Sequence, residues 1–379
     1  MPKASPYHAS GVDTHAGDRA VELMKKAVTA SHSSRVIGGL GGFAGLYDAS
    51  FLTSFRKPIL ATSTDGVGTK VAIASAMDVH DTIGYDLVGM VVDDIVVVGA
   101  TPLFMTDYIA CGRVVPERIA SLVRGIAEAC ASCGVSLVGG ETAEHPGLLG
   151  PEEYDVAGAA TGVVEAEEML DSTRVKEGDV VLAMASSGLH SNGFSLVRKI
   201  AGEAGWNYQD HRPEFSRALG LELLEPTRLY TPALLEVLST QAGAIHMVSH
   251  VTGGGIAQNL SRVIPQHLGV DVDRSTFSPP TVMRVLCDVA GFGLSEVEDT
   301  WNMGIGMIAM VDAGMASRVT TALTGAGHQV WQVGVVEKKD AQKAHDATTS
   351  AKGVEGGSIR LVGAYADSSS SSSSAHLST

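Results

Sequence analysis

Apolar and polar residues alternate along the chain with two different periods, and these periods predict where helices and strands lie. Over residues 82–98, apolar side chains recur every three or four positions, which is the spacing of a helix. Short apolar runs bounded by glycine, proline or polar residues predict strands. The same reasoning predicts helices near 19–28, 116–133, 193–202, 226–238 and 255–263, and strands at 58–63, 103–110, 135–138, 156–165 and 180–185.

The alternation is interrupted once, over residues 167–178, where the chain is polar and charged with little periodicity. We therefore predict a domain boundary there. Strands alternate with helices on both sides, and residues 282–336 continue the pattern, so both halves are predicted to be α/β domains. We expect an N-terminal extension with one helix (1–34), an N-terminal domain (35–170), a C-terminal domain (171–345), and a strand followed by a disordered serine-rich tail (346–379).

Composition and charge narrow the possible partners. The 379 residues include 27 Lys and Arg against 42 Asp and Glu, a net charge of −15 that disfavours binding to nucleic acid. A phosphorylated small molecule remains possible because backbone amides and Mg²⁺ can hold phosphate. The sequence has no apolar run of about 18 residues and no signal-peptide pattern at its start, so we expect no membrane association and a cytoplasmic location.

Four cysteines are present, and their small number fits a reducing compartment. Cys130 and Cys133 form a CxxC pair, but no second pair or histidine follows at the spacing of a zinc site. Cys130 also falls on the apolar face of the predicted helix at 116–133. We therefore predict that this cysteine belongs to the core.

Residues 38–45 form a glycine-rich loop, in which Gly39, Gly41 and Ala44 match the dinucleotide fingerprint GxGxxA. That fingerprint must follow a strand and open a helix, and the neighbouring sequence predicts neither, so we reject it. Two interpretations stay open: a plain mobile loop, or a loop that folds over nucleotide phosphates.

Residues 65–70 read Asp-Gly-Val-Gly-Thr-Lys and follow a predicted strand. The strand delivers Asp65 to its end, the glycines let the backbone approach a ligand, and Thr69 and Lys70 can donate to phosphate oxygens. The alternative is a capped turn with a solvated lysine, but six residues of these types in one cluster favour a functional site.

Two further places carry carboxylates. Glu141 follows a predicted strand and the glycines 139–140, which we interpret as a tight turn. Asp93 and Asp94 lie on the mostly apolar helix at 82–98, with Asp86 on the face of Asp93, and burying such groups unpaired is costly. We expect a metal-binding or hydrogen-bonded role there. If Asp65, Asp94 and Glu141 converge on one sheet edge, their oxygen ligands predict Mg²⁺.

Two loops in the second half join a strand to a helix. In residues 186–193, the amides of 191–193 would point at an anion, with Ser191 or Asn192 as the helix cap, and His190 is well placed for substrate contact. Residues 252–255 bring three glycines to a helix start, which makes either a phosphate-binding nest or a flexible loop. The sequence contains no P-loop, GxSxG or HExxH pattern.

In their order along the chain, these segments resemble the phosphoribosylformylglycinamidine cyclo-ligase family, also called aminoimidazole ribonucleotide synthetases. The resemblance runs from residue 10 to about residue 336. It rests on residues 10–13, 38–43, 64–70, 80–84, 102–104, 138–144, 154–158, 186–196, 226–228 and 252–255.

The resemblance implies a mixed α/β PurM-like fold, with N-terminal halves that pair into a dimeric β-barrel and a separate C-terminal α/β domain. It implies a cytoplasmic homodimer that binds ATP and Mg²⁺ and acts in purine biosynthesis. The implied reaction is the ATP-dependent closure of formylglycinamidine ribonucleotide to aminoimidazole ribonucleotide. ATP phosphorylates the formyl amide oxygen, and the amidine nitrogen then closes the ring.

The resemblance also implies roles for individual residues. His190 and Lys70 would be catalytic, and Asp65, Asp94 and Glu141 would hold Mg²⁺. The nucleotide would contact Gly38, Gly39, Gly41, Gly42, Asp65, Gly66, Gly68, Thr69, Lys70, Asp94 and Glu141. The substrate would contact Ser187, Gly188, His190, Ser191, Asn192, Thr252, Gly253 and Gly254.

The chain departs from the family pattern at Asp93, usually Asn, at Leu189, often Pro, and at His145, often Met. None of these changes removes an implied ligand. The first cysteine, Cys111, lies far from the glycine loop, which argues against a selenophosphate synthetase.

Other members of the superfamily fit less well. A formylglycinamidine ribonucleotide synthetase would need a longer chain or a glutaminase partner, and thiamine-monophosphate kinase lacks the turn at 186–193. A nucleotide-binding regulator without catalysis is disfavoured by the intact Asp65, Glu141 and His190.

Overall fold

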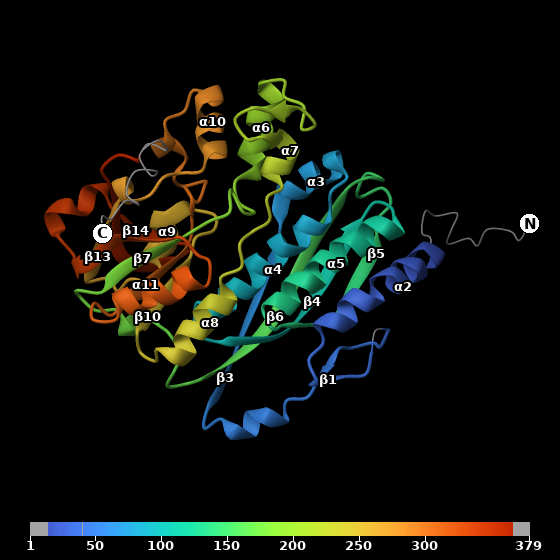
Figure 1. The fold of residues 1–379 in the computed structure, drawn as a ribbon, viewed down its shortest axis with the longest axis horizontal. Coiled ribbons are helices and arrows are strands. Elements are labelled where there is room, and N and C mark those ends of the chain that lie inside the picture. Colours follow the sequence, from blue (N-terminus) through green and yellow to red (C-terminus); the bar gives the residue numbers. More distant parts are fainter. Residues whose placement is uncertain (1–13, 40, 367–379) are drawn as a thin grey trace, which may run out of the picture. The chain divides into compact units, whose positions relative to one another are not determined.

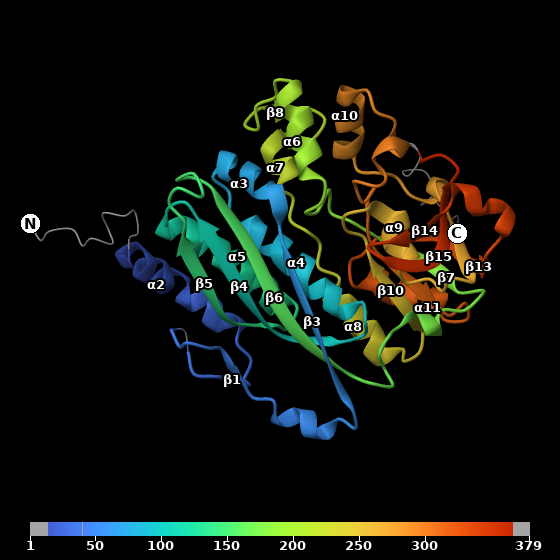
Figure 2. The same cartoon turned by 180° about the vertical axis from the view of Figure 1, so that it is seen from behind.

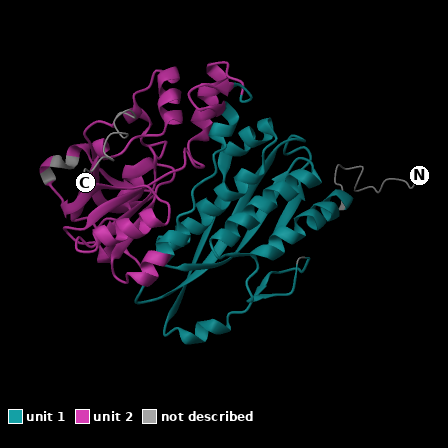
Figure 3. Cartoon of the chain, in the orientation of Figure 1, with its two compact units in different colours: residues 1–169, 208–210, 218–235 teal, residues 170–207, 211–217, 236–379 magenta. Residues whose placement is uncertain are grey.

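The computed structural model describes residues 14–39 and 41–366, and its internal contacts divide the chain into two compact units (Figure 3). Unit 1 comprises residues 1–169, 208–210 and 218–235, and unit 2 the remainder. Unit 2 begins at Leu170, within the polar segment in which we predicted a boundary. The return of 208–210 and 218–235 to unit 1 was not part of that prediction. Our expectations for residues 1–13, Leu40 and the serine tail lie outside the described residues.

Unit 1 is built on a four-stranded sheet with the order β3-β6-β4-β5. The first three strands pair antiparallel and β4 pairs parallel with β5. Side chains of β6 are buried at every second position up to Gly162, as expected when one face of a sheet is covered. The strand bounds are β3 (Pro58–Gly66), β4 (Thr101–Cys111), β5 (Ser136–Glu144) and β6 (Tyr154–Glu165).

Helices α2 (Thr14–Ser31), α4 (Asp81–Val96) and α5 (Pro116–Ser132) lie along one face of this sheet (Figures 1 and 2). Helices α4 and α5 come into backbone contact, because a Cβ at Gly84 would lie 2.1 Å from the amide nitrogen of Ile126. A Cβ at Gly125 would lie 1.9 Å from the carbonyl oxygen of Asp81. The two glycines therefore set how closely the helices pack.

Shorter elements complete unit 1. A two-residue hairpin, β1 (Val36–Ile37) with β2 (Leu46–Tyr47), carries the glycine-rich loop. The turn η2 (Gly68–Lys70) leads into α3 (Val71–Met77), which packs against α7 (Leu219–Leu223). The turn η1 (Ser50–Ser54) precedes β3.

Unit 2 contains a seven-stranded mixed sheet with the order β10-β12-β7-β13-β11-β15-β14. All pairs are antiparallel except β11 with β15. Strands β7 and β12 and the edge strand β10 are buried at every position. The strand bounds are β7 (Val180–Ala185), β10 (Ile245–His250), β11 (Leu268–Asp273), β12 (Ile305–Val311), β13 (Val330–Lys338), β14 (Thr348–Ala351) and β15 (Val354–Val362).

The helices of unit 2 are α6 (Phe194–Glu203), α9 (Gly255–Ser261), α10 (Thr281–Ala290) and α11 (Ala316–Gly325). Helix α8 (Thr231–Thr240) continues from the end of unit 1 into unit 2, and the two-residue strands β8 (His211–Arg212) and β9 (Arg217–Ala218) pair with each other. Among the described residues, no helix is long and apolar enough to cross a membrane.

Two predicted elements have different bounds in the structure. Strand β5 continues to Glu144, so residues 139–144 are strand and not the tight turn that we predicted. The predicted helix at 226–238 begins only at Thr231, because residues 225–230 form an irregular segment. In this segment the backbone amides of Thr227 and Tyr230 donate to Asp86 and Asp93 of α4.

Candidate functional site

The predicted nucleotide loop, residues 65–70, begins with the last two residues of β3 and ends in the turn η2. Gly66 donates its backbone N–H to Oδ1 of Asp65 at 2.7 Å. Gly68 has a φ of +70°, a conformation that favours glycine, and both Gly68 and Thr69 are exposed. Asp65 and Gly66 are half-buried, so a ligand can reach this side of the loop as well, whereas Val67 and Lys70 are buried.

Lys70 has a different place from the one that we predicted. Its side chain has no exposed surface, and its Nζ donates to Oδ1 of Asp86 at 2.8 Å and to the carbonyl oxygen of Glu225 at 2.8 Å. The ammonium is therefore held inside unit 1, and not at the loop surface where we predicted its contact with phosphate. Burial lowers the pKa of Lys70 and raises that of Asp86, and the attraction between the two opposes both changes.

Asp93 is also fully buried on α4. Oδ1 of Asp93 accepts the backbone N–H of Thr231 at 2.9 Å and its hydroxyl at 2.7 Å, and the N–H of Tyr230 also points to this carboxylate. The hydrogen-bonded role that we expected for this pair of acids is thus confirmed for Asp93. The sequence did not predict its partners, which lie more than 130 residues away along the chain.

The three carboxylates expected to share Mg²⁺ are not brought together in one chain. Asp65 pairs in register with Gly158, Gly158 with Asp107, and Asp107 with Gly140. Asp65 and Glu141 thus lie on opposite edge strands, about 14 Å apart at three strand spacings. Because side chains alternate along a strand, Glu141 also shares the face of Tyr108 and not that of Asp65.

Asp94 lies further along α4 than the part of the helix that is level with Asp65. Leu87 of α4 lies over Gly158, the partner of Asp65, since a Cβ at Gly158 would be 3.4 Å from Leu87 Cδ2. Asp94 follows seven residues later, about 10 Å further along α4. The described part of the chain holds no group of three or more His, Cys, Asp or Glu residues that could bind a metal. The predicted convergence on one sheet edge is therefore corrected: β6 and β4 separate the two edge strands.

The glycine-rich loop spans the β1–β2 hairpin, so no helix follows it. This finding agrees with our rejection of a dinucleotide fingerprint. Gly38 and Gly41 have φ values of +83° and +99°, and Phe43 is fully exposed between them and β2. Gly45 packs against β5, since a Cβ there would lie 2.7 Å from Val138.

In unit 2, the loop of residues 186–193 is held by its own hydrogen bonds. The backbone N–H of Ser187 donates to Nε2 of His190 at 3.1 Å, which makes this nitrogen an acceptor and places the ring proton of a neutral His190 on Nδ1. His190 has a φ of +58° and is only 1% exposed. The helix cap is Gly193, with no side-chain cap bond, so the expected capping by Ser191 or Asn192 is wrong.

The second predicted substrate loop lies beside the first. A Cβ at Gly253 would be 3.4 Å from Oδ1 of Asn192, which brings residues 186–193 and 252–255 together within unit 2. Gly254 has a φ of +100° at the start of α9. Asn259 of α9 donates to the carbonyl oxygens of Thr252 at 3.2 Å and of Gly255 at 2.8 Å, and these two bonds hold the loop against the helix.

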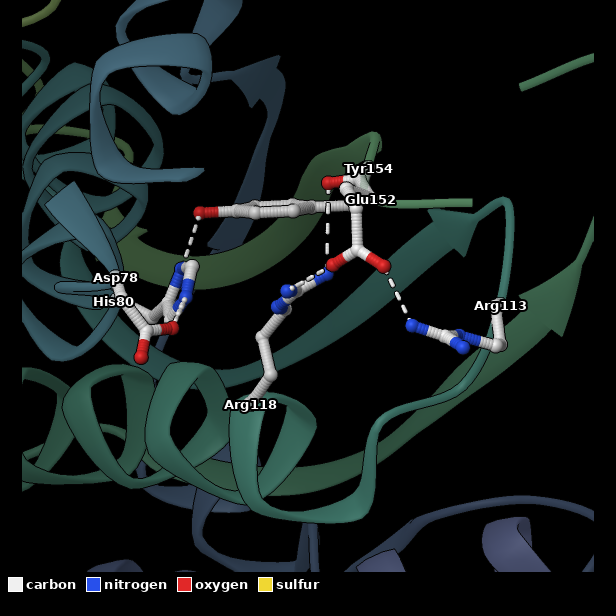
Figure 4. A network of polar contacts seen from close by, with 6 residues as sticks. All are labelled: Asp78, His80, Arg113, Arg118, Glu152 and Tyr154. Atoms are coloured by element: carbon white, nitrogen blue, oxygen red, sulfur yellow. Dashed lines mark hydrogen bonds and ion pairs between the residues drawn. The ribbon is translucent and has the colours of Figure 1, made fainter. Parts of the chain in front are cut away.

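A polar network joins two segments of the family resemblance in unit 1 (Figure 4). His80, at the start of α4, contacts the hydroxyl of Tyr154 at 3.0 Å and Oδ1 of Asp78 at 3.1 Å. Glu152 bridges Arg113 at 2.5 Å and Arg118 at 2.6 Å. Burial lowers the pKa of His80, which favours the neutral ring, and the hydrogen bond from Arg118 lowers the pKa of Glu152. The network fastens the start of α4 to β6.

The CxxC cysteines belong to the core, as predicted for Cys130. Cys130 is fully buried, with its sulfur 3.8 Å from Sδ of Met105, and Cys133 is 7% exposed. Burial raises the pKa of both thiols, which disfavours reactive thiolates. All four cysteines are free thiols.

Both α/β units correspond to domains of one known protein family. The model of the AIR synthase related protein N-terminal domain matches residues 48–164, and that of the C-terminal domain matches residues 176–347. The chain belongs to this AIR synthase related family. A phosphoribosylformylglycinamidine cyclo-ligase of Geobacillus sp. is 44% identical over 336 residues, which is 88% of this chain and 96% of the relative. One of the same name from Thermosynechococcus vestitus is 44% identical over 330 residues, which is 87% of this chain and 96% of the relative.

Solved structures share the fold at low sequence identity. The thiamine-monophosphate kinase of Stenotrophomonas maltophilia has a TM-score of 0.64 at 16% identity, covering 90% of this chain and 95% of its own. The hydrogenase maturation protein HypE in complex with ATP has a TM-score of 0.55 at 16% identity, covering 87% of this chain and 89% of its own. These likenesses establish the mixed α/β PurM-like fold.

Proposed function

We propose that this chain catalyses the ATP-dependent closure of formylglycinamidine ribonucleotide to aminoimidazole ribonucleotide in purine biosynthesis. One observation carries the proposal: 44% identity over 88% of the chain with an enzyme named phosphoribosylformylglycinamidine cyclo-ligase. Both domains of the family are matched as well.

The chemistry needs activation of a poor leaving oxygen. The formyl amide oxygen attacks the γ-phosphorus of ATP, and ADP leaves. The amidine nitrogen then attacks the activated carbon, the carbon–oxygen bond breaks, and inorganic phosphate and a proton are released. Such a reaction depends mainly on positioning the two ligands and excluding water.

For the nucleotide, we propose the surface formed by Gly66, Gly68 and Thr69, with the glycine-rich loop 38–42 closing over it. Backbone amides and the Thr69 hydroxyl supply the donors, and Lys70 takes no direct part. Mg²⁺, when bound with ATP, neutralises phosphate charge. It usually takes one or two protein carboxylates, and Asp65 suits this role. Asp94 and Glu141 are proposed to make separate contacts, because each lies too far from Asp65 in the same chain.

For the substrate, we propose the paired loops of unit 2. Ser187, Gly188, Ser191 and Asn192 line one side, and residues 252–254 the other. The contact between Asn192 and Gly253 supports one shared site. His190 is proposed to hold this turn through the amide of Ser187.

We also propose a cytoplasmic homodimer whose unit 1 sheets pair. On the sheet face opposite the helices, Leu60 is 60% and Tyr108 41% exposed, so large apolar side chains lie uncovered on this face within the chain. The buried free thiols support a reducing compartment. Sedimentation of the wild-type chain beside Leu60→Lys tests the dimer, and a monomeric wild type would contradict it.

One assay tests the activity. The chain is supplied with ATP, Mg²⁺ and formylglycinamidine ribonucleotide, and ADP and aminoimidazole ribonucleotide are followed together. Equal amounts of both products are expected. Hydrolysis of ATP without ring closure would overturn the proposal.

A further inference from the structure

Two buried aspartates on α4 hold the same segment of chain in the same way. Asp86 and Asp93 are seven residues apart and have no exposed surface. Oδ1 of Asp86 accepts the backbone N–H of Thr227 at 2.9 Å and its hydroxyl at 2.6 Å. Asp93 binds Thr231 with the same pair of groups, at 2.9 and 2.7 Å. Together they clamp residues 225–231 along two turns of the helix.

The Asp86 clamp additionally includes Lys70. Its Nζ donates to Asp86 and to the carbonyl oxygen of Glu225, both at 2.8 Å. Lys70 is also the last residue of the loop 65–70 and directly precedes α3. Three parts of unit 1 that are distant in sequence thus meet at one ammonium group: the loop, helix α4 and the segment 225–231.

The energetics favour a fixed arrangement. Removing one partner of a buried ion pair is strongly destabilising, because the remaining buried charge has no compensation. For its ammonium to reach a phosphate, Lys70 would have to leave both Asp86 and Glu225. Its charge is therefore placed to fix the backbone of the loop and not to contact the ligand.

We propose that Lys70, Asp86 and Thr227 form a positioning network that holds residues 65–70 in the conformation that binds nucleotide. This inference rests on the proposed function, which places ATP on that loop. Lys70 acts on ATP through the loop, so its charge is dispensable when Asp86 is neutralised with it.

The first test uses Thr227→Val and Thr231→Val as a matched pair. Each variant removes one hydroxyl from an equivalent clamp, and both are expected to lower the melting temperature by similar amounts. Thr227→Val is expected to raise the KM for ATP severalfold and to speed hydrogen exchange of the amides at 66–70. Thr231→Val is expected to change neither. Equal effects of the two variants on KM and exchange would overturn the proposal.

The second test is rescue. Lys70→Met leaves Asp86 as an uncompensated buried charge and is expected to weaken ATP binding, measured by calorimetry with Mg²⁺, at least tenfold. The double variant Lys70→Met with Asp86→Asn keeps the acceptor for Thr227 and is expected to recover most of the affinity. If the double variant binds ATP as poorly as Lys70→Met, the ammonium contacts phosphate directly and the proposal is wrong.

Failure of the proposed function gives a different result. If the wild-type chain does not bind ATP, or if Asp65→Ala leaves ATP binding unchanged, the loop is not the nucleotide site. The exchange rates at 66–70 still decide the positioning role: faster exchange in Thr227→Val than in Thr231→Val supports it, and equal rates overturn it.

Discussion

The carboxylate of Asp107 lies directly against the α-carbon of Gly140 on the neighbouring strand. A Cβ built on Gly140 would be 1.7 Å from Oδ1 of Asp107, a distance that no side chain can adopt. The two residues are register partners in the parallel pair β4–β5. The glycine at 140 is thus explained by the side chain beside it, and not by a turn.

We therefore expect Gly140→Ala to destabilise the protein by about 1–3 kcal/mol, the range for overpacking against a buried side chain, here that of Asp107. Gly139→Ala is the matched control, because a Cβ there would meet the backbone nitrogen of Gly45 at 3.9 Å, an ordinary van der Waals distance. Urea unfolding of the two variants measures the difference. Equal stability would show that the Asp107 side chain moves aside at little cost.

Asp107 also predicts a dependence of stability on pH. Burial raises its pKa to about 7, and the hydrogen bond to its own backbone amide lowers it only in part. In the unfolded chain this carboxyl loses its proton near its usual pKa of 3.8, so the folded state binds more protons between these two values. Its contribution to the free energy of unfolding therefore falls as pH rises from about 4 to about 7, then stays constant.

Asp107→Asn removes this titration while keeping the shape. At pH 8 the variant is expected to be more stable than wild type by a few kcal/mol, at about 1.4 kcal/mol for each pKa unit. The difference should shrink towards pH 4. Urea unfolding across this range checks the trend, and a constant difference at all pH values would show that Asp107 does not titrate with a raised pKa.

The local sequence pattern was sufficient to predict features that depend on a single helix, strand or loop. The spacing of apolar residues predicted α4 and α5 closely, and the position of Cys130 on an apolar face predicted its burial. The glycine-rich loop could be separated from a dinucleotide fingerprint because no helix follows it. Each of these conclusions needs only neighbouring residues.

The sequence could not show contacts between distant segments. From the sequence, Lys70 was interpreted as a donor at the end of a glycine loop. Only the structure shows that residues 225–227 lie beside it and bury it. The order β3-β6-β4-β5, which separates Asp65 from Glu141, is likewise a property of the whole sheet. One signal was available: Asp86 and Asp93 are seven residues apart on an otherwise apolar helix, which indicates buried partners.

The separation of Asp65 and Glu141 leads to a prediction about Mg²⁺. If the two residues contact the ligand independently, Asp65→Asn and Glu141→Gln should each raise the KM for Mg-ATP. Their effects should then add in the double variant to within about 0.5 kcal/mol, as for distant sites. Titration of activity with ATP at saturating Mg²⁺ measures all three variants. If the KM of the double variant is no higher than that of the more impaired single variant, both carboxylates hold one ion. That arrangement requires a second copy of the chain.

His190 offers a last test, because its geometry predicts a positioning effect. Its Nε2 accepts the amide of Ser187, so a Gln side chain could replace this acceptor while removing the titratable ring. We expect His190→Gln to keep more than about a tenth of the turnover, with a pH–rate profile parallel to that of wild type. His190→Ala should lose more and raise the KM for formylglycinamidine ribonucleotide, because the turn at 186–193 loses its internal bond. If both variants instead lose turnover equally, and one limb of the pH–rate profile disappears with the ring, His190 transfers a proton in the reaction.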